Sequence, residues 1–397
     1  MDLVSARLAA LSPSETLAMS QKSNELKARG IDVINLSVGE TDFNTPDHVK
    51  DAAKKAIDEN YSFYSPVPGY LSLREAICNK LKKENNLEYK PDQIVCSNGA
   101  KQSVCNVLLA LVNKGDEVII PAPYWVSYPE MVTIADGKSV IVSAGIEQDF
   151  KITPAQLEAA ITPQTKVFIL CSPSNPTGSV YSRDELKALA DVLAKYPNVY
   201  VLSDEIYEHI NYVGSHESIA QFENIRDRVI VVNGVSKCYA MTGWRIGWIA
   251  APKWIAAACN KLQGQYTSGP CSVAQKAAEA AYIDDAGFVA KVREAFTRRK
   301  KLVMELATQI PDFKVSEPQG AFYIFPDAAA YIGKSYDDRK IENSGDLAMY
   351  LLEVGHVACV GGGAFGAPTC IRMSYATSEE NLKKAFARIK DALGKLK

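Results

Sequence analysis

The stretch KVFILCSPSNPTGSVYSRDELKALADVLAKYPNVYVLSD (166–204) decides the fold, because it places a helix between two buried strands. KVFILCS and VYVLSD are short apolar runs bounded by turn residues, which is typical of strands covered on both faces. Between them the spacing predicts a helix over 183–196, with an apolar face made of Leu186, Leu189, Ala190, Leu193 and Ala194. A strand, a helix and a second strand in this order predict two parallel strands joined by a crossover helix.

The same alternation continues on both sides of this stretch. QIVCS (93–97) predicts a strand, and SVCNVLLALV (103–112) predicts the helix that follows it. Further strands are predicted at DEVIIPA, KSVIVSA, RVIVVNG and RIGWIAA. We therefore expect an α/β fold in which a mostly parallel seven-stranded sheet lies between helices.

A different pattern begins near Ala274. FVAKVREAFTRRKKLVMELA (288–307) predicts a long helix. Short strands, among them HVACV (356–360), and helices follow as far as a last helix from Ser378. The residues before 46 also fall outside the alternation. We therefore predict a large domain over 46–289 and a small α+β domain built from both ends of the chain, 1–45 and 290–397.

The composition is that of a folded globular protein rather than of a disordered or collagen-like chain. Of the 397 residues, 47% are hydrophobic and 23% are charged, and only 24 are Gly. The 44 Lys and Arg against 46 Asp and Glu give a net charge of −2. The chain therefore has no net positive field to attract nucleic acid or an anionic membrane, and we expect neither as a partner.

Cysteine usage and the N-terminus favour the cytoplasm. The nine Cys are scattered and none forms a CxxC pair, so we expect neither a disulfide framework nor a metal site. Asp2, Arg7 and Glu15 interrupt the N-terminus, which therefore lacks the apolar core of a signal peptide. The longest purely apolar run, Val107 to Val112, is far too short to span a membrane.

One motif is misleading. GGGAFG (361–366) matches the GxGxxG of dinucleotide-binding proteins. Such a site needs a helix directly after the glycines, whereas Ala367, Pro368, Thr369 and a strand-like CIRMSYA follow here. We therefore expect a loop that binds no dinucleotide.

The segment GVSKCYAMTGWRIG (234–247) carries the most chemistry. Lys237 directly follows a predicted strand and a Ser, and sites form at such strand ends in parallel sheets. A partly desolvated, neutral lysine can form a Schiff base with an aldehyde. Ser236 and Arg245 are residue types that bind phosphate. Taken alone, the segment is equally compatible with a surface Lys and Arg on a turn.

Two further segments place polar groups at the ends of neighbouring strands. SPSNPTG (172–178) contains Asn175, and VLSDEIY (201–207) contains Asp204 and Tyr207. An acid there can pair with a protonated pyridine nitrogen, while an Asn and a Tyr can hydrogen-bond a phenolic oxygen. A polar turn or a helix cap would explain each segment separately, but not the three segments together.

Together these segments resemble the fold-type I pyridoxal-phosphate enzymes, and among them the class I aminotransferases. The resemblance covers nearly the whole chain and includes NLSVGETDFNTP, FYSPVPGYLSLREAI, SNGAKQSVCN, PYWVSYPEM and CIRMSYATSEENL. It is strongest to bacterial aspartate aminotransferases of type Ib. The reaction that it implies is a ping-pong transfer of an amino group between an amino acid and a 2-oxo acid.

The resemblance implies specific roles around the cofactor, pyridoxal 5'-phosphate. Lys237 resembles the lysine that forms the Schiff base and moves the proton, and Asp204 resembles the acid that keeps the pyridine nitrogen protonated. Asn175 and Tyr207 resemble the partners of the ring's phenolate. Trp125 resembles the aromatic residue that stacks on the ring.

The phosphate of the cofactor and a second subunit are implied in the same way. Ser236 and Arg245 resemble the side-chain ligands of the phosphate. Backbone N–H groups that open a helix after a strand also favour phosphate binding, and here they belong to Gly99, Ala100 and Lys101. Tyr64, in FYSPVPG, resembles a tyrosine that reaches the phosphate of a neighbouring subunit, which implies a homodimer with shared sites.

Substrate recognition is implied by fewer residues. Arg372, in CIRMSYA, resembles the arginine that grips the α-carboxylate, for which a guanidinium fork is a natural partner. Lys101 stands where type Ib relatives place the lysine linked to the side-chain carboxylate, which favours aspartate and glutamate with oxaloacetate and 2-oxoglutarate. The predicted substrate site also includes Gly39, Trp125 and Asn175.

The N-terminal segment SPSETLAM, with Ser14 and Thr16, resembles a mobile lid that closes on a dicarboxylate. Relatives often carry Lys or Arg just before its Pro, whereas Ser12 stands there in this chain. This departure leaves open whether bulkier acceptors such as prephenate are used.

Two alternative functions are compatible with part of this sequence. A carbon–sulfur β-lyase, an aminocyclopropane-forming enzyme or an aromatic or alanine aminotransferase shares the fold and the Lys, Asp and Arg, but Lys101 favours transamination of dicarboxylates. Some transcriptional regulators carry an aminotransferase-like domain behind a DNA-binding head. Because the resemblance starts within the first fifteen residues, we do not expect such a head.

Overall fold

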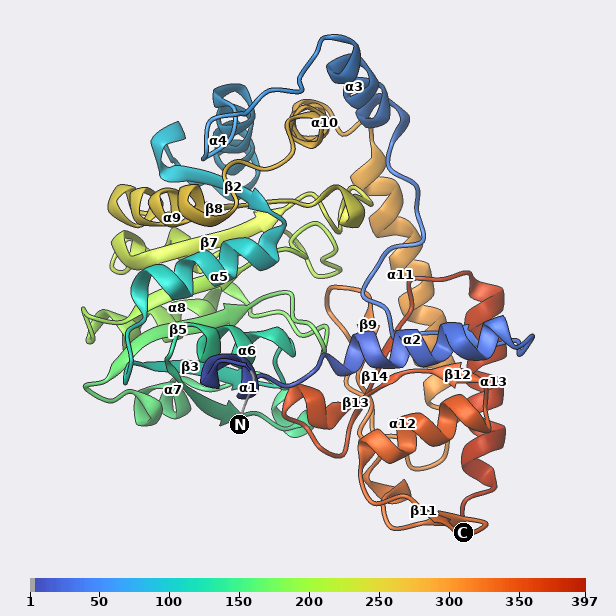
Figure 1. Ribbon diagram of the computed structural model, residues 1–397. Helices are drawn as coiled ribbons and strands as arrows, with labels where there is room; N and C mark the ends of the chain where they lie inside the picture. The colour runs from blue at the N-terminus through green and yellow to red at the C-terminus, as the bar shows by residue number, and fades with distance from the viewer. Residues whose placement is uncertain (1–3) are drawn as a thin grey trace.

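Seven strands form the central sheet of the larger part of the molecule (Figure 1). The computed structural model describes residues 4–397 of the chain. In order across the sheet, the strands are β2 (Ile94–Asn98), β8 (Ile246–Ala250), β7 (Val229–Gly234), β6 (Tyr200–Asp204), β5 (Thr165–Cys171), β3 (Glu117–Ala122) and β4 (Lys138–Ser143). Every neighbouring pair is parallel except the two pairs that β8 makes with β2 and β7. The expected mostly parallel seven-stranded sheet is confirmed.

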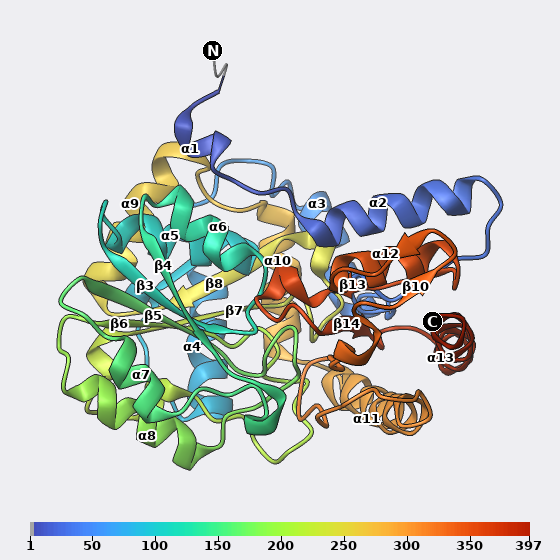
Figure 2. The same cartoon turned by 90° about the horizontal axis from the view of Figure 1, so that it is seen from below.

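Helices cover both faces of this sheet (Figure 2). One face is covered by α5 (Ala100–Leu111), α6 (Ser127–Ile134) and α9 (Lys253–Tyr266). The other is covered by α4 (Leu71–Asn85), α7 (Pro154–Ala160), α8 (Arg183–Ala194) and α10 (Ser272–Ile283). Successive strand residues point to opposite faces, so Ile94 and Cys96 join one core and Val95 joins the other. Two buried faces explain why the strands appear as continuous apolar runs.

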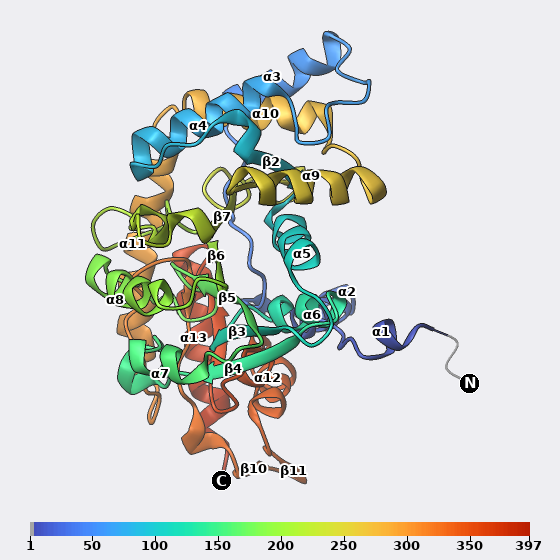
Figure 3. The ribbon, with the colours of Figure 1, turned by 90° about the vertical axis from the view of Figure 1, so that its left-hand side faces the viewer.

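Local capping fixes where the helices begin. The hydroxyl of Ser182 accepts a hydrogen bond from the backbone N–H of Glu185, whose carboxylate accepts one from the N–H of Ser182, so α8 starts at Arg183 as predicted. It ends at Ala194, two residues earlier than predicted. Helix α3 (Asp47–Asp58) lies alongside α10, beyond the β2 edge of the sheet (Figure 3).

Residues from both ends of the chain share a second hydrophobic core. Met19, Val33 and Ile34 pack there with residues from the range 292–396. Strand β1 (Ile34–Asn35) pairs in parallel with β12 (Val357–Ala358), which joins the two ends directly. A three-stranded antiparallel sheet follows the order β13 (Val360–Gly361), β14 (Ile371–Ser374), β9 (Tyr323–Ile324). The other elements are α2 (Glu15–Ala28), α11 (Phe288–Ala307), α12 (Ser344–Glu353), α13 (Glu379–Gly394) and the hairpin β10 (Ser335–Tyr336) and β11 (Arg339–Lys340).

The proposed division into 46–289 and 1–45 with 290–397 stays a prediction, and residues 1–3 of that division lie outside the described residues. Helix α11 runs through the boundary at 289, because it begins at Phe288. The short helix α1 (Ala6–Ala9) packs against α6 of the larger part, where Arg7 pairs with Asp136 at 2.9 Å.

The glycine-rich motif at 361–366 forms a single turn of 3-10 helix over Gly362–Phe365, between the antiparallel strands β13 and β14. No α-helix opens after it, so the geometry of a dinucleotide site is absent from this motif. Among residues 4–397, no helix combines the length and the apolar character needed to cross a lipid bilayer.

Candidate active site

A cavity of about 280 Å³ opens at the carboxyl edge of the central sheet. It lies where the loops after β3, β5, β6 and β7 meet β14 and the segment after β1. The predicted site residues that line it are Gly39, Ala100, Lys101, Trp125, Asn175, Asp204, Tyr207, Ser236, Lys237, Arg245 and Arg372. The fold therefore collects in one place residues that are scattered along the whole sequence.

The antiparallel direction of β8 brings Arg245 to this edge. Asn98, at the end of β2, pairs with Ile246 at the start of β8, and Arg245 directly precedes Ile246. Gly99, which precedes α5, has φ +81°, and a Cβ there would lie 2.1 Å from Nη2 of Arg245. Only glycine therefore fits between the guanidinium and the start of the helix. A helix N-terminus beside a guanidinium is an arrangement that binds anions.

Lys237 lies in the turn after β7 and lines the cavity. Its Nζ donates a hydrogen bond of 2.6 Å to the carbonyl oxygen of Gly39 and lies 5.8 Å from the centre of the Tyr207 ring. Burial, followed by the positive charge of Arg372, lowers the pKa of Lys237 to about 8. A substantial share of this amine is therefore neutral, and so nucleophilic, close to neutral pH.

Asp204, the last residue of β6, is almost completely buried at 4% exposure. Burial raises the pKa of Asp204, and two hydrogen bonds to its carboxylate oppose this effect. The hydroxyl of Tyr128 donates to Oδ2 at 2.6 Å, and the backbone N–H of Ile206 donates to Oδ1 at 3.2 Å. Since Asp204 also lines the cavity, its remaining lone pairs can accept a hydrogen bond from a ligand there.

Arg372, in β14, brings a buried positive charge to the cavity. Its Nη1 donates to Oδ1 of Asn175 at 2.9 Å, and its Nη2 donates to the carbonyl oxygen of Ser37 at 2.6 Å. Its Nε has no hydrogen-bond partner within residues 4–397. None of its partners in that range is a carboxylate, so an anionic ligand would satisfy both the charge and the free donor.

Aromatic rings line the same cavity. The hydroxyls of Tyr207 and Tyr323 lie 2.8 Å apart, and the guanidinium of Arg372 lies 4.7 Å from the centre of the Tyr323 ring. Nζ of Lys101 lies 5.1 Å from the centre of the Trp125 ring. Burial lowers the pKa of Lys101, which has no acidic partner in the part of the chain described.

Of the remaining predicted residues, Ser14 and Thr16 line the cavity and Tyr64 does not. Tyr64 is 98% exposed and does not line the cavity, so its role toward a neighbouring subunit stays a prediction. Ser14 and Thr16 do line the cavity, next to Ser12, whose backbone N–H donates to a carboxylate oxygen of Glu130 at 3.0 Å. Closure of this segment over a ligand stays a prediction.

The sequence interpretation missed several residues that line the cavity, namely Leu17, Val126, Ser127, Tyr128, Cys171, Ile206, Thr242 and Tyr323. Tyr128 could have been found, because it follows Trp125 by three positions at the start of a helix. Tyr323 could not have been found in this way, because nothing in GAFYIFP distinguishes it from a core residue of a strand.

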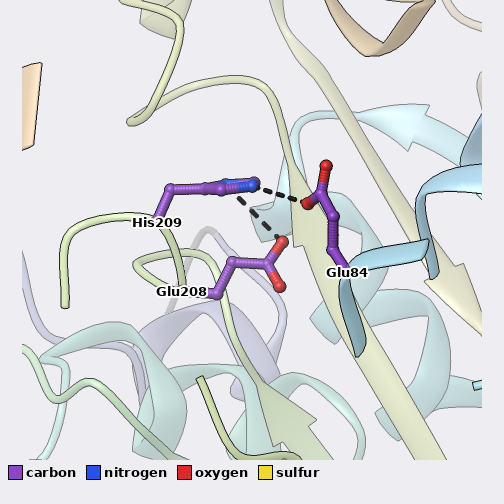
Figure 4. A group of neighbouring side chains, drawn as sticks. All are labelled: Glu84, Glu208 and His209. Atoms are coloured by element: carbon purple, nitrogen blue, oxygen red, sulfur yellow. Dashed lines mark hydrogen bonds and ion pairs between the residues drawn. The ribbon is translucent and has the colours of Figure 1, made fainter. Parts of the chain in front are cut away.

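A second polar cluster follows Tyr207 in the chain (Figure 4). Nε2 of His209 lies 2.8 Å from a carboxylate oxygen of Glu84, and its Nδ1 lies 3.7 Å from one of Glu208. Burial disfavours the charged imidazole, but the carboxylate of Glu208 outweighs this effect and raises the pKa of His209 to about 10. His209 is therefore positively charged at neutral pH.

This cluster contains residue types that bind metals, but its central carboxylate already has partners. Glu208 forms an ion pair with the buried Lys80 and accepts hydrogen bonds of 2.7 Å from the amides of Asn85 and Asn233. We therefore interpret it as an ionic network that anchors the turn after β6 to α4, and we assign no metal to it.

A parallel sheet with a lysine, an acid and an arginine at its carboxyl edge is the arrangement of an aminotransferase. The sequence profile of the family described as aminotransferase class I and II matches residues 31–389, and the chain belongs to this family. The expected membership is confirmed.

Individual relatives match over almost the whole chain. An aspartate/prephenate aminotransferase of Cereibacter sphaeroides is 49% identical over 98% of this chain and 98% of its own. A bifunctional aspartate aminotransferase and glutamate/aspartate-prephenate aminotransferase of Petunia hybrida is 48% identical over 99% of this chain and 83% of its own. The solved structure of an aspartate aminotransferase from Rhizobium meliloti has a TM-score of 0.96 at 41% identity and covers 100% of both chains. One from Thermus thermophilus with maleate has a TM-score of 0.93 at 40% identity, over 99% of this chain and 100% of its own.

Proposed function

We propose that the protein is a pyridoxal-phosphate-dependent aminotransferase that moves the amino group of aspartate or glutamate to 2-oxoglutarate or oxaloacetate by a ping-pong mechanism. One observation carries the proposal: Arg372 and Lys101, two cations without acidic partners in the described part of the chain, line the same cavity as Lys237. A dicarboxylic amino acid presents one carboxylate to each cation. The names of the relatives from Cereibacter and Petunia support aspartate as donor and prephenate as a further acceptor.

The side chains of the cavity fit pyridoxal 5'-phosphate. The bare backbone at Gly99 leaves the first N–H groups of α5 and the guanidinium of Arg245 accessible together, and with Ser236 they would hold the phosphate. Asp204 would hold the ring nitrogen, and Lys237 would hold the aldehyde carbon covalently. When bound, the cofactor supplies an electron sink for the bond that the substrate must break.

Residues of the chain perform the remaining work. The amine of Lys237 would remove the proton from the substrate's α-carbon and deliver it to the carbon of the cofactor's aldehyde group, which suits an amine whose pKa is about 8. Arg372 fixes the α-carboxylate and so orients that proton toward Nζ. Asp204 would supply a fixed negative charge to the ring nitrogen of the cofactor. Ser14 and Thr16 would exclude water when the N-terminal segment closes.

The working unit in this proposal is a cytoplasmic homodimer with shared sites. Phe63 is 80% exposed and Tyr64 is 98% exposed, and a second copy of the chain would cover both rings and receive Tyr64 at its phosphate site. The nine cysteines are all unpaired, which supports a reducing compartment. The site would lie between the two proposed domains, 46–289 and 1–45 with 290–397, and it needs no metal.

A panel of amino donors tests the reaction. The purified protein is given pyridoxal phosphate and 2-oxoglutarate with aspartate, alanine, cysteine or phenylalanine, and then aspartate with prephenate as acceptor. We expect aspartate to be the best donor, with one glutamate formed for each aspartate consumed. Release of pyruvate and ammonia without consumption of 2-oxoglutarate would indicate a β-lyase and would contradict the proposal.

Lys237→Ala tests the assignment of the catalytic lysine. We expect this variant to lose both the visible absorbance of the covalently bound cofactor and its turnover. The control is Lys151→Ala, which removes a mostly buried lysine paired with Glu185 at 2.6 Å and should leave both signals in place. Near-normal turnover by Lys237→Ala would contradict the assignment of Lys237 as the catalytic lysine.

A further inference from the structure

We propose that Tyr128 is a positioning residue that holds the carboxylate of Asp204 charged and directed at the ring nitrogen of the cofactor, a role that rests on the proposed function. Tyr128 lies in the first turn of α6 and is only 1% exposed. Its hydroxyl donates the hydrogen bond of 2.6 Å to Oδ2 of Asp204. Both residues line the cavity, so the contact lies directly beside the ligand space.

The contact is short, within the range in which hydroxyl donors bind carboxylates. Hydroxyl donors approach a carboxylate to about 2.5–2.7 Å, and neutral oxygen partners typically to about 2.7–2.8 Å. A carboxylate that is 4% exposed has lost most of its water, so protein donors must replace it. Within residues 4–397 only two donors do so, and the other, the N–H of Ile206, is longer at 3.2 Å.

Tyr128 also packs against Trp125, the ring that is predicted to stack on the cofactor. Trp125 and Tyr128 are three positions apart, and their rings meet edge to face with centroids 5.3 Å apart and an interplanar angle of 89°. Tyr128 therefore contacts both Trp125, the ring predicted to stack on the cofactor, and Asp204, the acid predicted to bind its nitrogen. A purely structural tyrosine would explain the packing, but it would not need its hydroxyl on a carboxylate.

Tyr128→Phe tests the role, because it keeps the ring and removes only the hydroxyl. We expect the dissociation constant for pyridoxal phosphate to rise roughly tenfold or more, which is the worth of a hydrogen bond to a charged group, and kcat to fall with little change in KM. The same measurement is made with a cofactor analogue that carries C–H in place of the ring nitrogen. There the affinity of Tyr128→Phe should equal that of the unmodified protein, since the analogue offers Asp204 no cation.

The matched control is Tyr350→Phe. Tyr350 is equally buried, and its hydroxyl donates to the carbonyl oxygen of Ala392 at 2.7 Å, in the core shared by the two chain ends. This variant should bind both cofactors as the unmodified protein does. A second check uses Asp204→Asn, in which the loss caused by adding Tyr128→Phe should disappear, because no charge is left to hold.

An equal loss of affinity for both cofactors, an unchanged affinity, or additive losses with Asp204→Asn would overturn the proposal. If Tyr128→Phe does not fold, Tyr128→His keeps a ring N–H donor and should retain most of the affinity for pyridoxal phosphate; a loss of roughly tenfold or more would then overturn it. If the unmodified protein neither binds pyridoxal phosphate nor transaminates, the proposed function itself has failed. If it does both and Tyr128→Phe behaves like Tyr350→Phe, only the role of Tyr128 has failed.

Discussion

The buried charge of Arg372 lowers the pKa of Lys237, in addition to its proposed role in binding the substrate. It has no carboxylate partner within residues 4–397, and after burial it is the largest cause of the lowered pKa of Lys237. A substrate carboxylate that binds Arg372 would neutralise this influence and raise the pKa of the amine again. In the proposed reaction, binding of the substrate would therefore make Lys237 a stronger base at the stage when a base is needed.

Loading of the cofactor should report the pKa of Lys237. Only the neutral amine attacks an aldehyde, so the rate of capture by the cofactor-free protein should rise about tenfold per pH unit below pH 8 and level off above it. Stopped-flow absorbance measures this rate. A lysine with an ordinary pKa of about 10.4 would still accelerate between pH 9 and 10, and such a profile would contradict the expectation.

Lys101 is expected to select dicarboxylic substrates. Lys101→Ala should lower kcat/KM for aspartate by roughly 10- to 100-fold, because a charged hydrogen bond to the side-chain carboxylate is lost, and should leave the value for alanine nearly unchanged. Lys166→Ala is the control, since Lys166 stacks 5.2 Å from the Tyr200 ring at the opposite end of the strands. Equal losses with both amino acids would remove Lys101 from substrate recognition.

Single residues were predictable from the sequence where a strand end or a motif singled them out. Lys237, Asp204 and Asn175 follow apolar runs, so their convergence at one sheet edge follows from a parallel sheet. Arg372 was placed only by the family resemblance, because its strand has four residues and lies far along the chain. The pairing of Tyr207 with Tyr323 was not predictable, since it depends on how β9 packs against the turn after β6.

At the scale of elements, the turn after β6 contributes both to the candidate active site and to a buried ionic network. Asp204, at the end of β6, and Tyr207, in the turn, line the cavity, and the next two residues, Glu208 and His209, form an ionic network with α4, part of which is shown in Figure 4. Because Glu208 and His209 adjoin Tyr207 in the chain, movement of α4 relative to the sheet would displace that ring. The network therefore fixes the position of this turn relative to α4.

Because of His209, the free energy of unfolding should decrease as the pH rises into the alkaline range. Its pKa is about 10 in the folded protein and about 6.5 in an unfolded chain, so its stabilising effect is complete below pH 6.5 and is lost as the pH rises through 10. At pH 7, His209→Gln should lower the free energy of unfolding by about 1.5–3 kcal/mol, the range for a charged hydrogen bond. Urea titrations at pH 7 and pH 10 test this; a deficit that stays constant with pH would refute it.

Long elements were predicted well, and short ones poorly. Helices α8 and α11 carry apolar faces of several turns, and both begin at their predicted residues. HVACV was predicted as one short strand, but it forms β12 and β13 on either side of Cys359. The two halves pair with different partners, β1 and β14, and strands of two residues leave no periodicity from which to predict such a switch.

At the scale of the whole molecule, each of the two larger cores is assembled from distant parts of the chain. The pairing of β1 with β12 was not predicted; the absence of alternation at both ends predicted only a small domain shared by the two ends, and that division stays a prediction. The position of α1 against α6 was not predicted either, because nothing in the sequence indicates that Arg7 and Asp136 pair. Contacts between separated surface charges leave no local pattern.

Two exposed aromatic residues allow a test of the proposed homodimer. Phe63→Asp should shift the protein from dimer to monomer in sedimentation equilibrium and should weaken cofactor binding, because Tyr64 would no longer reach the partner's site. Val213→Asp is the control: Val213 is 46% exposed and lies in the loop where Tyr212 bonds to Gln319. A stable monomer with full activity would exclude shared sites.

The reversed direction of β8 also limits how the enzyme can be redesigned. Lys237 and Arg245 stand eight positions apart on the connection from β7 into β8, which also carries Ser236 and Thr242, whereas most other residues that line the cavity lie on other segments. The length of this connection sets the spacing between Lys237, the proposed covalent anchor of the cofactor, and Arg245, one proposed ligand of its phosphate. Insertions and deletions between 237 and 245 cannot be absorbed elsewhere, so this segment should be exchanged between relatives as one block of fixed length.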